Sequence, residues 1–184
     1  MKPDIAPQAL LDTIDADTML REVQDWAAIN TGTANIEGLD RMAGILADAF
    51  SVLPGDVELI DPATVTAISA EGREFEKPHG RHMVLRVRPD AERRFVLTGH
   101  MDTVFPVDHP FQEVSWIDDD MINGPGTADM KGGLDVILHA LNTFETMECA
   151  QHVGYDVMIN SDEETGSLAS RSLIEELARG KYAA

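Results

Sequence analysis

The chain has 184 residues, with 14 basic and 33 acidic side chains, so its formal net charge is −19. This charge repels phosphate backbones and anionic lipid, which argues against nucleic acid and membranes as partners. The length allows one domain with a sizeable core. A single cysteine, Cys149, fits a reducing compartment. The sequence shows neither a signal pattern nor an apolar run of about 18 residues, so we expect a cytoplasmic protein.

The first third of the chain predicts two helices. Residues 1–14 are expected to form a loose lead-in. A helical pattern then begins at Asp17, with Asp17 or Thr18 as its N-cap and residues 30–32 as its stop. The second helix follows the i, i+3, i+4, i+7, i+11 rule. Its apolar positions are Leu39, Met42, Ala43, Leu46 and Phe50.

The remaining elements alternate between strands and helices. Strands are predicted at 56–60, 64–69, 82–88, 93–99, 114–118 and 155–160, and helices at 132–144 and 167–180, the last capped by Gly180. The turn-like segment 89–92 predicts that its two flanking strands form an antiparallel pair. The order of elements predicts an α/β fold, a three-layer α/β/α domain with a mixed sheet.

Three polar clusters occupy loops of this arrangement. GHMD (99–102) ends one predicted strand, NGPGTADMKGG (123–133) leads into a helix, and NSDEETGS (160–167) follows another strand. Ligands of open α/β sheets gather beyond the carboxyl ends of strands, so we expect the clusters to meet. They offer His100, Asp102, Asp129, Lys131, Asp162, Glu163 and Glu164.

These residue types suit a metal centre. His100, Asp129 and Glu164 offer an imidazole and two carboxylates from three loops, which suits a hard or borderline cation. Asp102 lies too near His100 to bind the same ion easily and is better placed to accept the second ring N–H. Of Glu163 and Glu164, one would bind metal while the other takes a proton from water.

Simpler interpretations compete with this one. His100 and Asp102 would also form an ordinary surface pair, and residues 162–164 would also complement the dipole of a following helix. The glycine-rich loop lacks phosphate-loop spacing, and the preceding acidic run lacks the glycine of an EF-hand. Cys149 is expected to be inert. The other histidines are expected to be structural or exposed: His79, His82, His109, His139 and His152.

Three segments together resemble the metal-site segments of one family: TGHMDTVF, NGPGTADMKGGLDVILHAL and INSDEETGSLASRSLIEELA. This is the acetylornithine deacetylase, succinyl-diaminopimelate desuccinylase and glutamate carboxypeptidase family of zinc metallohydrolases. The resemblance covers about residues 90–180 and is nearest to the glutamate carboxypeptidase branch. It implies a zinc-peptidase-like fold.

The resemblance also implies a role for each residue. His100 is similar to the terminal ligand of one zinc ion, and Asp102 to the carboxylate that orients it. Asp129 resembles the aspartate that bridges two zinc ions, with a cis peptide bond after it. Glu163 resembles the general base, and Glu164 the terminal ligand of the second zinc.

The implied activity is hydrolysis of an amide bond in an N-acyl amino acid or at the C-terminal residue of a peptide, of the carboxypeptidase or deacetylase type. The implied cofactor is Zn²⁺, two ions per complete site, with Co²⁺ as a substitute. The family needs two further ligands, a carboxylate and a histidine, that we do not find in residues 1–184. Its lid domain, which usually dimerises, is also absent.

We therefore expect residues 1–184 to be the N-terminal part of a catalytic domain, incomplete at its C-terminus and inactive alone. An open strand edge and an exposed apolar face would favour aggregation or a partner chain. The expected partner is a complementing chain here, or a second copy in a homodimer of the complete enzyme. One alternative is a non-catalytic interaction or regulatory fragment, or half of a split enzyme. Another is a carboxylate-rich metal-binding protein. The adjacent pair Glu163 and Glu164 favours an enzyme over this last alternative, because binding alone needs no spare base.

Overall fold

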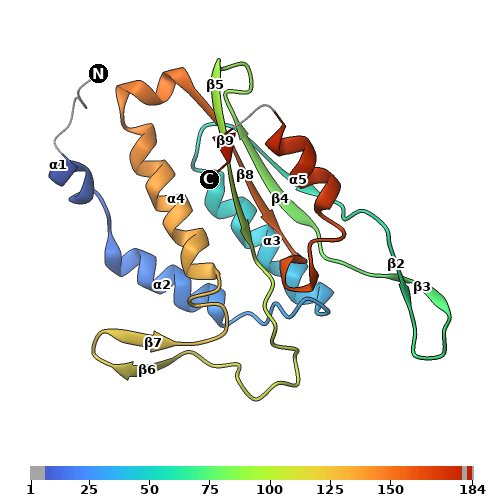
Figure 1. The fold of residues 1–184 in the computed structure, drawn as a ribbon. Coiled ribbons are helices and arrows are strands. Elements are labelled where there is room, and N and C mark those ends of the chain that lie inside the picture. Colours follow the sequence, from blue (N-terminus) through green and yellow to red (C-terminus); the bar gives the residue numbers. More distant parts are fainter. Residues whose placement is uncertain (1–6, 180–181, 184) are drawn as a thin grey trace.

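The computed structural model describes residues 7–179 and 182–183. A five-stranded mixed sheet lies at its centre, in the order β1-β4-β8-β5-β9 (Figure 1). Its strands are β1 (Asp56–Ile60), β4 (His82–Val87), β5 (Arg93–His100), β8 (Val153–Asn160) and β9 (Tyr182–Ala183). The α/β class and the mixed sheet are confirmed.

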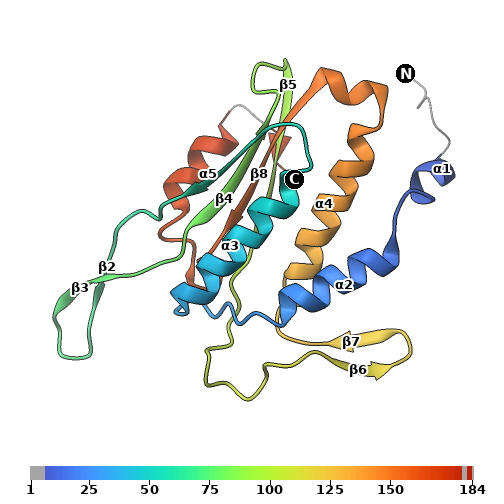
Figure 2. The same ribbon diagram turned by 180° about the vertical axis from the view of Figure 1, so that it is seen from behind.

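Helices cover both faces of this sheet. On one face lie α3 (Ile36–Phe50) and α4 (Lys131–Glu145), with α2 (Ala16–Ala27) beside α4 (Figures 1 and 2). On the other face, Leu177 of α5 (Arg171–Ala178) packs on Val84, Val96 and Met158. The molecule therefore has the three layers that the sequence predicts. Within the described residues, no helix is long and apolar enough to cross a membrane.

The pairing predicted for 82–88 and 93–99 is wrong. β8 lies between β4 and β5, antiparallel to β4 and parallel to β5. Every residue of β8 after Val153 is buried. A strand buried along its length needs a partner on each edge, and this requirement overrides the local tendency of β4 and β5 to form a hairpin. One consequence matters for function: His100 at the end of β5 lies opposite Asn160 at the end of β8.

Two hairpins extend from the end of the molecule that is lower in Figure 1. β2 (Val65–Ile68) pairs with β3 (Glu74–Lys77), and β6 (Ser115–Asp118) pairs with β7 (Met121–Asn123). The first strand of each hairpin is predicted by sequence and the second is not. Both second strands are short and largely exposed, so they carry little of the alternating pattern that marks a half-buried strand.

The buried positions of the helices agree with the sequence prediction more closely than the helix ends do. All five predicted apolar positions of α3 are fully buried. The N-cap of α2 is Asp15 rather than Asp17 or Thr18, because the Asp15 carboxylate accepts the Thr18 N–H at 3.1 Å. A further helix, α1 (Pro7–Leu11), lies in the expected lead-in. α5 starts at Arg171 rather than at 167, and its predicted cap Gly180 lies outside the described residues.

Candidate metal centre

The three polar clusters meet where β5 and β8 end and α4 begins. The Nε2 atom of His100 lies 2.9 Å from the Oδ1 atom of Asp129. One ligand atom from each of His100, Asp129 and Glu164 lies within 4.8 Å of the other two. Glu163 stands beside this group, with its Oε2 atom 3.9 Å from the same imidazole nitrogen. The four side chains therefore converge on one spot, as the motifs lead us to expect.

The group is open to solvent on its acidic side. The imidazole of His100 is buried, whereas the side chains of Asp129 and Glu163 are 77% and 53% exposed. One imidazole and two carboxylates form a donor set that suits zinc and similar divalent ions. Burial alone lowers the pKa of His100, but hydrogen bonds with Asp102 and Asp129 outweigh it and raise the pKa to about 9.

The buried Asp102 contacts both the ring of His100 and the loop that carries the two glutamates. Its buried carboxylate accepts hydrogen bonds from the hydroxyl of Thr33 at 2.7 Å and from the backbone N–H groups of Glu163 and Glu164 at 3.2 Å each. The Nδ1 atom of His100 lies 3.1 Å from the Asp102 carbonyl oxygen and 3.4 Å from its carboxylate. Asp102 therefore fixes the ring and also fixes the loop that carries both glutamates.

Thr33 is a contributor that sequence reasoning missed. It lies between α2 and α3, far from all three clusters in sequence. Backbone hydrogen bonds bring this segment to the end of β5: Thr33 N–H donates to the Thr103 carbonyl at 3.3 Å, and Thr103 N–H donates to the Thr31 carbonyl at 2.9 Å. Nothing in the local sequence signals this long-range pairing.

The loop before α4 turns tightly to present Asp129. The peptide bond between Asp129 and Met130 is cis, as the resemblance implies. Gly126 has a φ of +75°, a conformation that glycine adopts readily. A Cβ atom on Gly132 would lie 2.4 Å from the carbonyl oxygen of Thr127, so this position has no room for a side chain.

Two of the seven polar residues from the motifs serve the fold instead. The buried Nζ atom of Lys131 donates to the carbonyl oxygens of Trp26 and Ile29 at 3.0 and 2.8 Å, and burial lowers its pKa to about 8. The buried carboxylate of Asp162 accepts hydrogen bonds from Ala169 N–H at 2.7 Å and the Ser170 hydroxyl at 2.6 Å. Asp162 therefore shapes the loop between β8 and α5, which explains why α5 starts late.

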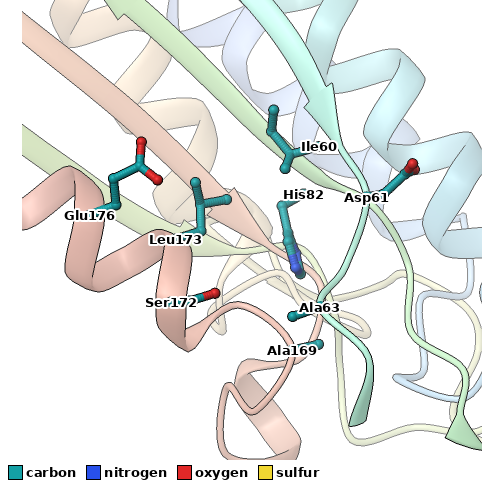
Figure 3. A pocket seen from close by; sticks show the side chains of 8 residues that line it. All are labelled: Ile60, Asp61, Ala63, His82, Ala169, Ser172, Leu173 and Glu176. Atoms are coloured by element: carbon teal, nitrogen blue, oxygen red, sulfur yellow. The ribbon is translucent and has the colours of Figure 1, made fainter.

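Two depressions flank the metal-ligand group. One of about 350 Å³ includes Thr33 and Glu164 in its lining, and one of about 230 Å³ includes His100 and Glu163. A separate pocket of about 230 Å³ lies beside His82 (Figure 3). Its carboxylates, on Asp61 and Glu176, point away from the imidazole, so it does not gather metal ligands.

Comparison with known proteins shows which family the second half of the chain resembles. Residues 96–184 match the model of peptidase family M20/M25/M40. This second half of the chain is therefore similar to M20 peptidases. Carboxypeptidase G2 from Pseudomonas sp. (strain RS-16) is 29% identical over 167 residues, which cover 91% of this chain and 37% of that protein. The resemblance to the zinc metallohydrolase family is thereby confirmed.

Solved structures of M20 peptidases share the fold. Human carnosine dipeptidase 1 superposes with a TM-score of 0.73 at 21% identity, over 95% of this chain and 38% of that one. The M20 metallo-carboxypeptidase Sso-CP2 from Sulfolobus solfataricus has a TM-score of 0.64 at 22% identity, over 89% and 34%. A Staphylococcus aureus tripeptidase has a TM-score of 0.63 at 26% identity, over 92% of this chain and 43% of that one. The chain thus spans less than half the length of each of these relatives.

Proposed function

We propose that this chain belongs to a dinuclear zinc-dependent hydrolase that cleaves the amide bond of an N-acyl amino acid or of the C-terminal residue of a peptide. One observation carries the proposal: His100, Asp129 and Glu164 converge while Glu163 lies beside them as a fourth group. A binding site alone has no use for the fourth group, whereas hydrolysis needs a base. The family match and the relatives named as carboxypeptidase and dipeptidase support this reaction class.

In this proposal each side chain has a distinct task. His100 and Asp129 would hold one zinc ion, and Asp129 and Glu164 would hold the other. The chemistry that bound zinc would supply there is polarisation of the scissile carbonyl and acidification of water. The Glu163 carboxylate takes a proton from the attacking water and passes it to the leaving amine. Asp102 keeps the His100 ring and the glutamate backbone in place.

We further propose that residues 1–184 are the N-terminal part of the catalytic domain. In this arrangement the described residues give each zinc ion two protein ligands, and catalytic zinc sites in proteins usually have three. The matched region covers only 37% of carboxypeptidase G2. The remaining ligands and a lid domain would come from a continuing or complementing chain, or from a homodimer partner. On its own, the 184-residue chain would bind zinc weakly at this centre, without sustained turnover. A cytoplasmic location stays a prediction.

The test is a hybrid enzyme in which these residues replace the matching segment of carboxypeptidase G2. With zinc present, we expect it to hydrolyse members of a panel of N-acyl amino acids. Glu163→Gln should lower kcat by a factor of about 10² to 10⁴, because the base is lost while the ligands remain. Circular dichroism and zinc content check that both forms are folded and loaded.

Two results would contradict the proposal. A folded, zinc-loaded hybrid whose activity is unaffected by Glu163→Gln would remove the proposed base. Sustained hydrolysis by the isolated 184-residue chain, abolished in Glu163→Gln, would show that these residues are complete by themselves.

A further inference from the structure

A second group of metal-ligating side chains lies between α2 and α4, the two helices that run side by side in Figures 1 and 2. Asp135 and His139 are one turn apart on α4, and Glu22 faces them from α2. One ligand atom from each of the three lies within 4.8 Å of the other two. This α2–α4 cluster shares no residue with the centre at His100.

Asp135 is the unusual member of the α2–α4 cluster. The residue is 1% exposed, and its Oδ1 atom has no hydrogen-bond partner among the described residues. That oxygen lies 3.5 Å from the Nε2 atom of His139. A buried carboxylate oxygen without a donor costs free energy. Its position beside the imidazole indicates that a positively charged species fits at this point.

The distances within the cluster are compatible with a metal ion. Zinc binds imidazole nitrogen and carboxylate oxygen at about 2.0–2.2 Å, so tetrahedral ligands lie roughly 3.3 Å apart. The 3.5 Å between Asp135 and His139 already matches this spacing. Glu22 lies closer, with Oε2 2.6 Å from the same nitrogen, a distance typical of a hydrogen bond. Its side chain is 33% exposed, so the carboxylate can shift toward solvent until it reaches the roughly 3.3 Å spacing of metal ligands.

We propose that Glu22, Asp135 and His139 form a second divalent-metal site, separate from the centre at His100, which takes Zn²⁺ or a similar transition-metal ion and ties α2 to α4. The site has three protein ligands and an outer side open to water. It does not include Glu163 and has no spare base among its three residues, so its role is to hold the two helices together. The competing explanation is a proton: burial raises the pKa of Asp135 to about 7.

The test removes the first centre and asks whether metal still binds. The 184-residue chain carrying His100→Ala and Glu164→Gln is titrated with Zn²⁺ by calorimetry and with Co²⁺ by visible absorption. We expect one equivalent of each to bind. Adding Asp135→Asn or His139→Gln should weaken binding by more than the roughly 10- to 100-fold that loss of a supporting group costs. His152→Gln, at an exposed histidine outside the cluster, is the matched control and should change nothing.

Thermal unfolding guards against misfolded variants. Zn²⁺ should raise the Tm of the His100→Ala, Glu164→Gln chain and leave that of its Asp135→Asn derivative unchanged. The proposal would be overturned if the His100→Ala, Glu164→Gln chain bound no equivalent of metal, or if binding were equal with and without Asp135→Asn. Protonation of Asp135 would then remain as the explanation. Since the first centre is already disabled, neither result depends on the proposed hydrolase activity.

Discussion

At the residue scale, Asp102 is the side chain on which the most contacts of the centre depend. Its carboxylate joins four groups from three parts of the chain: the hydroxyl of Thr33, the ring of His100 at 3.4 Å, and the backbone N–H groups of Glu163 and Glu164. Groups that orient metal ligands typically matter almost as much as the ligands. The sequence motif predicts that Asp102 lies beside His100. The hydrogen bonds that Asp102 accepts from the Glu163 and Glu164 backbone become apparent only in the folded structure.

Asp102→Asn tests this role. The substitution keeps the size of the side chain but turns one acceptor into an NH₂ donor that faces N–H groups. We expect zinc affinity, measured by competition with a chromogenic chelator, to fall by about 10- to 100-fold. Asp48→Asn, the same substitution at an exposed position near the C-terminal end of α3, is a control that should leave affinity unchanged. An unaltered affinity in Asp102→Asn would show that Asp102 does not support the ligands.

At the element scale, Lys131 connects the start of α4 to the end of α2. Its ammonium group donates to two carbonyl oxygens near the C-terminus of α2, where the helix dipole favours a positive charge. Lys131→Met keeps the apolar stem but leaves both carbonyl groups without that donor. We expect the free energy of unfolding, measured in urea, to fall by about 2–3 kcal/mol. Lys77→Met, at a half-buried position of β3, should lower the free energy of unfolding much less.

The elements also show what sequence can predict. The buried face of α3 follows from local spacing, because Leu39 and its partners need only an apolar sheet to pack on. The neighbours of β4 and β5 could not be predicted locally, since burial of the distant strand β8 decides them. The start of α5 differs from its prediction for a local reason: the carboxylate of Asp162 accepts hydrogen bonds from Ala169 and Ser170, and these bonds hold the segment before Arg171 in a loop.

At the scale of the whole molecule, sheet order creates the candidate centre. β5 and β8 run parallel as neighbours, so their carboxyl ends bring His100 and the glutamate loop together. The motif residues were predictable because each follows a strand or precedes a helix. Thr33 was not, because its approach depends on how the α2–α3 connection packs against the rest of the chain.

The most direct measurement of the central claim is anomalous diffraction at the zinc edge from crystals of the zinc-loaded chain. We predict density within about 2.0–2.2 Å of ligand atoms from His100, Asp129 and Glu164, with the Glu163 carboxylate outside bonding distance. Zinc bound elsewhere with this group empty, or zinc coordinated by Glu163 in place of Glu164, would contradict the account.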